Sequence, residues 1–114
     1  MNLADIARQL NLTLLTEPKD LTEIIPSSGY ASDMLSCVMT GAARQGIWIT
    51  LQAHSNIVAV AALLDLSAVI ITEGAMPDPG IIEKANEKGV TLFSTLLPTF
   101  TIAGQLWALG LRSE

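Results

Sequence analysis

Residues 67–74, with the sequence SAVIITEG, constrain the fold of this chain more than any other segment. Their apolar side chains follow one another without the polar alternation of a strand that has one face in water. An unbroken apolar run of this length is typical of a parallel strand covered on both faces. Such a strand requires helices on either side of its sheet.

Strand and helix patterns alternate regularly around this segment. The sequence predicts strands at residues 46–52 and 90–95, and helices at 56–65, 79–88 and 97–110. Asp78 and Pro79 are typical of a helix start, and Gly89 of a helix end. Because the connections are short, we expect an α/β fold: a layered, largely parallel sheet with helices on its faces.

The N-terminal part is less regular. Asn2 predicts a helix cap, and an apolar stripe with helical spacing follows it. Residues 12–17 and 24–25 predict short strands, and Ser32 can cap a helix over 33–43. The sequence contains no linker and no repeat, so we expect residues 1–114 to form a single domain.

The composition is unusually apolar. Half of the residues are hydrophobic, and the mean hydropathy is +0.47. We do not expect one small core to hide Trp48, Trp107, Met34 and Met39 fully, and we therefore expect a homodimer. In the last helix, the spacing places four residues on one stripe: Phe100, Ala103, Leu106 and Trp107.

Several classes of protein are disfavoured. The longest apolar run, residues 57–64, is far shorter than the roughly 20 residues that span a bilayer. No basic stretch followed by an apolar one marks a secretory signal, so we expect a cytoplasmic protein without a membrane segment. Six basic and eleven acidic side chains give a net charge of -5, which disfavours nucleic-acid binding.

Ligands of open parallel sheets bind beyond the carboxyl ends of the strands. We expect residues 26–30, 50–56 and 72–76 to meet there, each before a helix whose free N–H groups attract a polar ligand. The candidate ligand-binding residues are Ser28, Gly29, Gln52, His54, Ser55, Asn56, Thr72 and Gly74. The alternative is that the polar residues are only helix caps, namely Ser32, Ser55 or Asn56, Asp78 and Thr95.

His54 is the only histidine of the chain. It suits a general base, a partner of Cys37 as nucleophile, or an imidazole that contacts a ligand. No Cys–His signature, Walker A loop or G-x-G-x-x-G motif is present, and one cysteine cannot hold an iron–sulfur cluster. We therefore expect no catalytic residue, no metal and no resident cofactor.

Residues 47–95 resemble the DRTGG domain, and the resemblance extends over nearly the whole chain. The family is named for an Asp-Arg pair after one strand and a Thr-Gly-Gly after the next. This chain has Ala53 and His54 in place of the pair, and Thr72, Glu73 and Gly74 in place of the triplet. Only Thr72 and Gly74 match directly, so a function that depends on the Asp-Arg pair is not implied.

The resemblance implies a fold similar to the N-terminal domain of HPr kinase/phosphorylase, which lacks the kinase active site. It also implies a non-catalytic regulatory module that senses a nucleotide or another small metabolite. The QAHSN form, residues 52–56, resembles a stand-alone subgroup found near hydrogenase genes, which implies a redox or metabolic enzyme as partner. Two alternatives are a structural or docking subunit without ligand, and an enzyme that uses His54 with Cys37 or Glu73.

Overall fold

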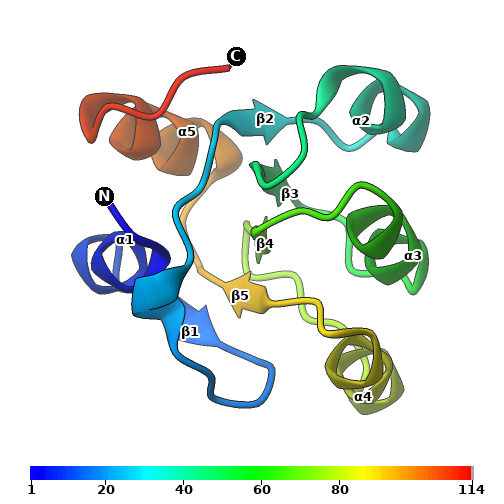
Figure 1. Ribbon diagram of the computed structural model, residues 1–114. Coiled ribbons are helices and arrows are strands. Elements are labelled where there is room, and N and C mark those ends of the chain that lie inside the picture. The colour runs from blue at the N-terminus through cyan, green and yellow to red at the C-terminus, as the bar shows by residue number, and fades with distance from the viewer. Residues whose placement is uncertain (114) are drawn as a thin grey trace.

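A five-stranded sheet forms the middle layer of the protein (Figure 1). The computed structural model describes residues 1–113. The strands are β1 (Thr13–Leu14), β2 (Gly29–Ala31), β3 (Ile47–Thr50), β4 (Ala68–Ile71) and β5 (Leu92–Ser94), and they lie in the order β1-β5-β4-β3-β2. Strands β2 to β5 are parallel, and only β1 is antiparallel to its neighbour. The expected largely parallel α/β sheet is confirmed.

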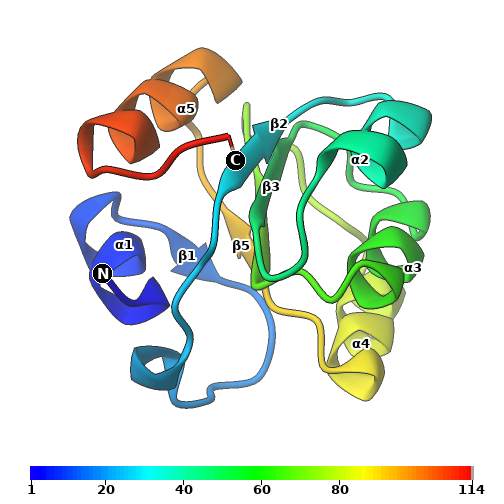
Figure 2. The same cartoon turned by 45° about the horizontal axis from the view of Figure 1, so that its top comes forward.

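Helices cover both faces of the sheet, as Figures 1 and 2 show. They are α1 (Leu3–Gln9), α2 (Leu35–Gly41), α3 (Asn56–Leu63), α4 (Pro79–Lys88) and α5 (Thr99–Ala108), with a short 3₁₀ helix, η1, at Leu21–Glu23. Helices α1 and α5 lie on one face, and α2, α3 and α4 on the other. Within residues 1–113, no helix has both the length and the apolar character that a bilayer crossing requires.

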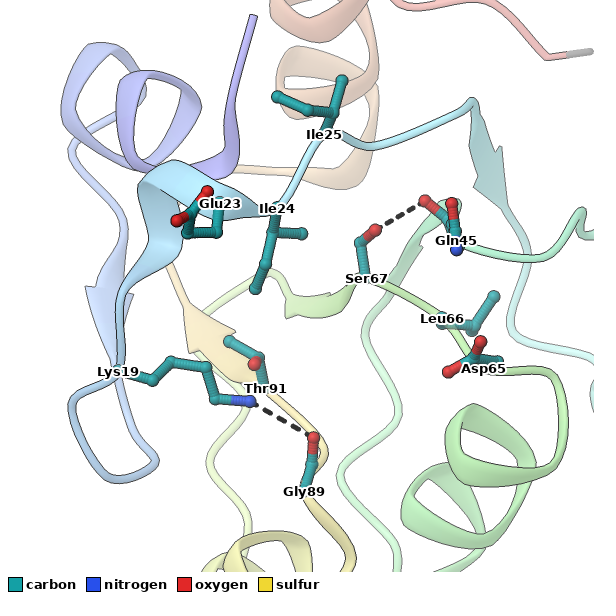
Figure 3. A pocket seen from close by; sticks show the side chains of 10 residues that line it. All are labelled: Lys19, Glu23, Ile24, Ile25, Gln45, Asp65, Leu66, Ser67, Gly89 and Thr91. Atoms are coloured by element: carbon teal, nitrogen blue, oxygen red, sulfur yellow. Dashed lines mark hydrogen bonds between the residues drawn. The ribbon is translucent and has the colours of Figure 1, made fainter.

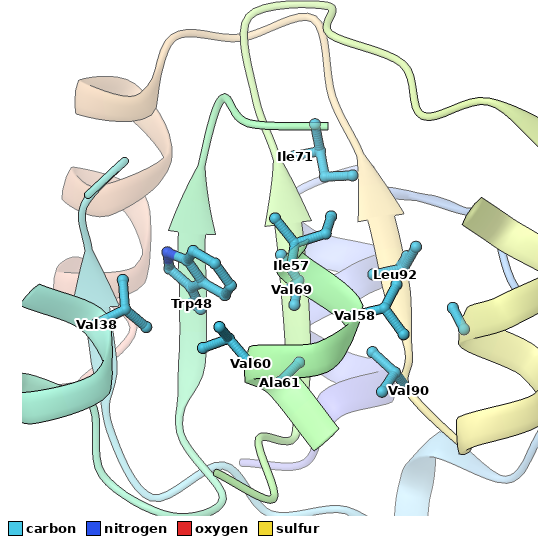
Figure 4. Close-up of a cluster of buried hydrophobic side chains, with 11 residues drawn as sticks. Val38, Trp48, Ile57, Val58, Val60, Ala61, Val69, Ile71, Val90 and Leu92 are labelled. Atoms are coloured by element: carbon cyan, nitrogen blue, oxygen red, sulfur yellow. The ribbon is translucent and has the colours of Figure 1, made fainter. Parts of the chain in front are cut away.

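Strand β4, the apolar run that predicted a buried strand, lies between two hydrophobic cores. All four residues of β4 are buried, as the sequence predicts. Val69 and Ile71 point toward α2, α3 and α4, where they join Trp48 and Leu92 (Figure 4). Ala68 and Ile70 belong to the opposite core with residues of α1 and α5. Helices on both faces therefore hold the carboxyl ends of β3, β4 and β5 in fixed positions.

The predicted strand at residues 24–25 does not form, and β2 begins at Gly29 instead. The reason is topological, because β1 and β2 lie on opposite edges of the sheet. Residues 15–28 must cross the amino ends of β5, β4 and β3 to connect them. On this path Ile24 accepts a hydrogen bond from the backbone N–H of Leu3 rather than from a strand.

The predicted apolar stripe of α5 is wrong for two of its four residues. Ile102 and Leu106 face the core, whereas 89% of Phe100 and 55% of Trp107 are exposed. Leu106 was predicted correctly, and Ala103 is half-buried. The helix is rotated so that Ile102 and Leu106, four residues apart, make its inner face.

Candidate functional site

The carboxyl ends of β3, β4 and β5 bring two of the three predicted segments together. Hydrogen bonds continue beyond the strands: the N–H of Thr72 donates to Thr50 O at 2.9 Å, and the N–H of Thr95 donates to Ile71 O at 3.0 Å. The loop after β3 therefore lies beside the loop after β4. This places Gln52 to Asn56 and Thr72 to Gly74 on the same edge, as expected.

Ser28 and Gly29 do not lie at this edge, so their expected placement is wrong. They lie at the amino end of β2, because the strand begins several residues later than the sequence suggested. Ser28 is buried there, and its carbonyl accepts a hydrogen bond from the N–H of Ile47 at 2.8 Å. The N–H of Gly29 donates to Arg112 O at 2.8 Å. These backbone groups of Ser28 and Gly29 therefore stabilise the fold at the amino end of β2.

Asp33 organises the loop after β3, a role that sequence analysis missed. Its carboxylate accepts hydrogen bonds from the Thr50 hydroxyl at 2.7 Å and from the Leu51 N–H at 2.9 Å. Its backbone carbonyl accepts a third hydrogen bond from the side-chain amide of Gln52. The start of α2 is thereby clamped to the loop that leads to His54. No sequence pattern predicted this role, because Thr50 and Leu51 lie 17 and 18 residues further along the chain.

Helix α3 begins without a side-chain cap. His54, Ser55 and Asn56 are exposed at this start, while Gln52 is half-buried. The first N–H groups of the helix are satisfied only by short-range bonds, from Ile57 to His54 O and from Val58 to Ser55 O, both at 3.1 Å. The prediction that Ser55 or Asn56 caps the helix is therefore wrong. The partial positive charge of this helix end is not neutralised by a side chain.

The loop after β4 is occupied by contacts within the fold. The hydroxyl of Thr72, which is fully buried, lies 2.6 Å from that of Thr99, and Glu73 Oε2 accepts a hydrogen bond from the Thr99 N–H at 3.0 Å. Glu73 thus caps α5. The N–H groups of Glu73 and Gly74 donate to Leu97 O and Thr95 O.

Gly74 has a left-handed backbone with φ of 75°, which glycine adopts without strain. A Cβ atom at this position would lie 3.4 Å from Leu96. Gly74 therefore holds the turn against the next loop, whereas the exposed polar side chains gather at the start of α3.

Of the other predicted caps, only Asn2 binds an N–H group of its helix, whereas Ser32 and Thr95 bind N–H groups that lie before α2 and α5 begin. The Ser32 hydroxyl accepts a hydrogen bond from the Met34 N–H at 3.1 Å, and the Thr95 hydroxyl accepts one from the Leu97 N–H at 3.2 Å. Asp78 precedes α4 but makes no side-chain cap bond. Asn2 caps α1 through the N–H of Asp5 at 2.8 Å, as predicted.

The groups proposed for catalysis have other partners. Cys37 is exposed on α2, and its thiol contacts the Met34 sulfur at 3.6 Å. The Glu73 carboxylate is bound to the start of α5. In residues 1–113, no hydrogen bond joins either group to His54, and no three His, Cys, Asp or Glu side chains group as metal ligands would.

A cavity of about 300 Å³ lies at the opposite, amino edge of the sheet, below the segment that crosses from β1 to β2 (Figure 3). Lys19 donates to Gly89 O at 3.3 Å, and the Ser67 hydroxyl donates to Gln45 O at 2.6 Å. No sequence pattern predicted this cavity, because it exists only through the crossing of residues 15–28 over the sheet.

Comparison with known proteins agrees with the expected resemblance. The family model of the DRTGG domain matches residues 5–108. A solved structure of the CBS and DRTGG domains of the regulatory region of Clostridium perfringens pyrophosphatase, complexed with the activator diadenosine tetraphosphate, has a similar fold. It is 22% identical with a TM-score of 0.74, and the match covers 90% of this chain but 44% of that one.

No match was found among curated protein sequences. The family model, however, spans most of the chain, and the structural match covers nine-tenths of it with a similar fold. This chain therefore belongs to the DRTGG domain family.

Proposed function

We propose that this domain is a regulatory module without catalytic activity of its own, and that it senses a small molecule at the start of α3. The observation that supports this most strongly is the uncapped helix. Asn2 closes the start of α1 and Glu73 that of α5. Helix α3, like α2 and α4, has no side-chain cap, and it begins at three exposed polar residues, His54, Ser55 and Asn56. A ligand that accepts hydrogen bonds at this point would complete what no side chain supplies.

The proposed contacts come from one loop and its neighbour. Gln52, His54, Ser55 and Asn56 provide amide, imidazole and hydroxyl groups at the helix start. Gly74, on the loop after β4, would contribute backbone atoms only, because it has no side chain. Asp33 holds the first loop in place without needing to touch the ligand. Ser28 and Gly29, at the other end of β2, are not part of this proposed site.

Adenine nucleotides are the first ligands to test. The similar pyrophosphatase region is regulatory and was solved with a dinucleotide activator. The net charge of -5 disfavours ligands with many phosphates, although the positive end of α3 offsets part of this repulsion. We therefore expect the nucleoside part of the ligand to supply much of the binding.

Thermal unfolding with AMP, ATP, diadenosine tetraphosphate and acetyl phosphate tests the proposal. A ligand at about 100 times its Kd stabilises the folded state by about 2.7 kcal/mol, which raises Tm by several degrees. His54→Ala should remove most of this rise. Because His54 is exposed, the substitution alone should change stability by less than about 0.5 kcal/mol.

Glu87→Ala, at an exposed position of α4, is the control and should keep the full rise. A rise in Tm that survives His54→Ala would place the ligand elsewhere. Absence of any rise at millimolar concentrations would contradict ligand sensing and favour the docking subunit.

We also propose that the domain acts on or within a larger metabolic or redox enzyme system. The similar solved structure is the regulatory region of an enzyme, which supports an enzyme as partner. Residues 52–56, QAHSN, resemble the stand-alone subgroup found near hydrogenase genes, and this resemblance supports a hydrogenase-related system as the partner. The loop that holds this form is the one clamped by Asp33, so ligand and partner can act on the same element.

The proposed assembly is a homodimer. Trp48 is buried, contrary to the expectation that it is hard to hide, but Met34, Met39 and Leu63 are exposed on or beside α2 and α3. Light scattering at micromolar concentration should give twice the mass of the 12.1 kDa chain. The double variant Met39→Ser/Leu63→Ser should shift the protein toward the monomer, while Leu96→Ser should not. A monomer in the wild type would contradict the proposal.

A further inference from the structure

A second exposed surface lies beside the start of α5, and we call it the β4–β5 rim. It consists of Glu73, Met76, Asp78, Leu96, Leu97 and Phe100. Met76 and Leu96 line one hollow, and Glu73 bonds to Leu97 and to the start of α5. Asp78 follows Met76 by two residues, and Phe100 lies in the first turn of α5. Leu96 is 87% exposed, Phe100 89% and Met76 62%. Several large apolar side chains this exposed in neighbouring loops are typical of an interaction site.

The rim is held together by hydrogen bonds between its two loops. The N–H of Glu73 donates to Leu97 O at 2.9 Å, and the N–H of Gly74 donates to Thr95 O at 3.1 Å. Phe100 follows Leu96 by four residues, at the start of the helix that Glu73 caps. The exposed side chains therefore project from a fixed base rather than from separate loose loops.

Leu96 separates two hollows in this surface. One, of about 220 Å³, is lined by Thr13, Gly74, Met76 and Thr95 among others. The other, of about 330 Å³, is lined by residues of the loops after α1 and β5 and of α5, including Asn11, Leu97 and Gln105. A surface with an apolar ridge between two hollows can accept side chains of a partner on either side of the ridge.

The charge of the rim restricts the partner. Residues 89–111 contain no charged side chain, and no Lys or Arg occurs between Arg44 and Lys84. Glu73 and Asp78 are thus the only charged residues of the rim, and both are exposed. Two copies of this surface would bring carboxylates together, so a second copy of this chain fits poorly. A partner with Lys or Arg beside apolar side chains is complementary.

We propose that the β4–β5 rim is the docking surface for a segment of a partner protein that carries apolar side chains flanked by Lys or Arg, such as the face of a basic amphipathic helix. Phe100 and Leu96 contact the apolar side chains, and Glu73 and Asp78 pair with the basic ones. The inference rests on the docking part of the proposed function and is independent of the ligand at α3.

The test uses two synthetic amphipathic peptides of 18 residues that share a leucine face. One has lysine at its polar positions and the other has glutamate. Calorimetric titration should show binding of the lysine peptide at least about tenfold tighter than that of the glutamate peptide. Phe100→Ser should weaken binding of the lysine peptide by about tenfold or more, and Asp78→Asn should weaken it by about threefold. Glu87→Gln, which removes one negative charge near the end of α4 and away from the rim, should leave its affinity unchanged.

Because Phe100 is almost fully exposed, Phe100→Ser should keep the wild-type Tm, which separates lost docking from lost folding. Equal binding of both peptides, or full binding by Phe100→Ser, would overturn the proposal. A wild-type dimer that becomes a monomer on the substitution Phe100→Ser would also overturn the proposal, since a second copy of the chain would then occupy the rim. A failed nucleotide screen with intact peptide binding would contradict ligand sensing alone.

Discussion

Replacing Trp48 with alanine is expected to lower the free energy of unfolding by about 3–5 kcal/mol, the largest effect of any substitution considered. Trp48 is fully buried in the core beneath α2 and α3. Its indole N–H also donates to Ser32 O at 2.8 Å, so the variant loses both packing and a hydrogen bond at the end of β2. Urea denaturation followed by circular dichroism measures the change.

Trp107→Ala is the matched control, because it removes the same side chain from an exposed position. More than half of Trp107 is exposed, and its ring packs against the Arg112 guanidinium at 4.1 Å. We expect it to cost about 1 kcal/mol or less. Equal losses for the two tryptophans would contradict the assignment of Trp48, rather than Trp107, to the core.

Asp33→Ala is expected to have the largest effect on ligand binding of any residue that does not contact the ligand. The Thr50 hydroxyl and the Leu51 N–H lose their acceptor, which should cost about 1–2 kcal/mol of stability. The loop to His54 then has to be ordered at the moment of binding, which reduces affinity. The nucleotide-induced rise in Tm should therefore fall to a small fraction of the wild-type value.

Asp78→Ala provides the control for this effect. Asp78 is also an exposed acid next to a helix start, but its side chain makes no cap bond. It should change stability by less than about 0.5 kcal/mol and keep the nucleotide-induced rise. A variant Asp33→Ala that shows the full rise would mean that the clamped loop is not the binding element.

The second half of the fold follows from local signals in the sequence. The unbroken apolar run at β4 required cover on both faces, and the structure places helices there. Gly89 ends α4 with φ of 72°, as a glycine after a helix predicts. Each of these signals concerns neighbours in the sequence, so it can be interpreted without knowing the rest of the fold.

The errors arose where distant segments decide the structure. The start of β2 depends on residues 15–28 crossing the sheet, and the inner face of α5 depends on which side chains meet the opposite core. The role of Asp33 depends on Thr50 and Leu51, which are 17 and 18 residues away in the sequence. No period or motif marks such contacts.

The candidate site was therefore only partly predictable. The sequence placed Gln52 to Asn56 beside Thr72 to Gly74, because parallel strands end at one edge. It did not show that Thr72 and Glu73 are engaged with α5. It also did not show that α3 begins without a side-chain cap, whereas α1 and α5 are closed by Asn2 and Glu73. Only the three-dimensional contacts show which polar groups already have hydrogen-bond partners within the fold.

The most direct measurement of the central proposal is an amide NMR titration of the wild-type protein with AMP and diadenosine tetraphosphate. Binding at the start of α3 predicts that the shifted signals are those of Leu51 to Ile57, with smaller shifts near Gly74. Shifts gathered around Lys19, Gln45 and Ser67 would place the ligand in the amino-edge cavity instead (Figure 3). That result, or no shift at millimolar concentrations, would contradict a nucleotide-sensing site at α3.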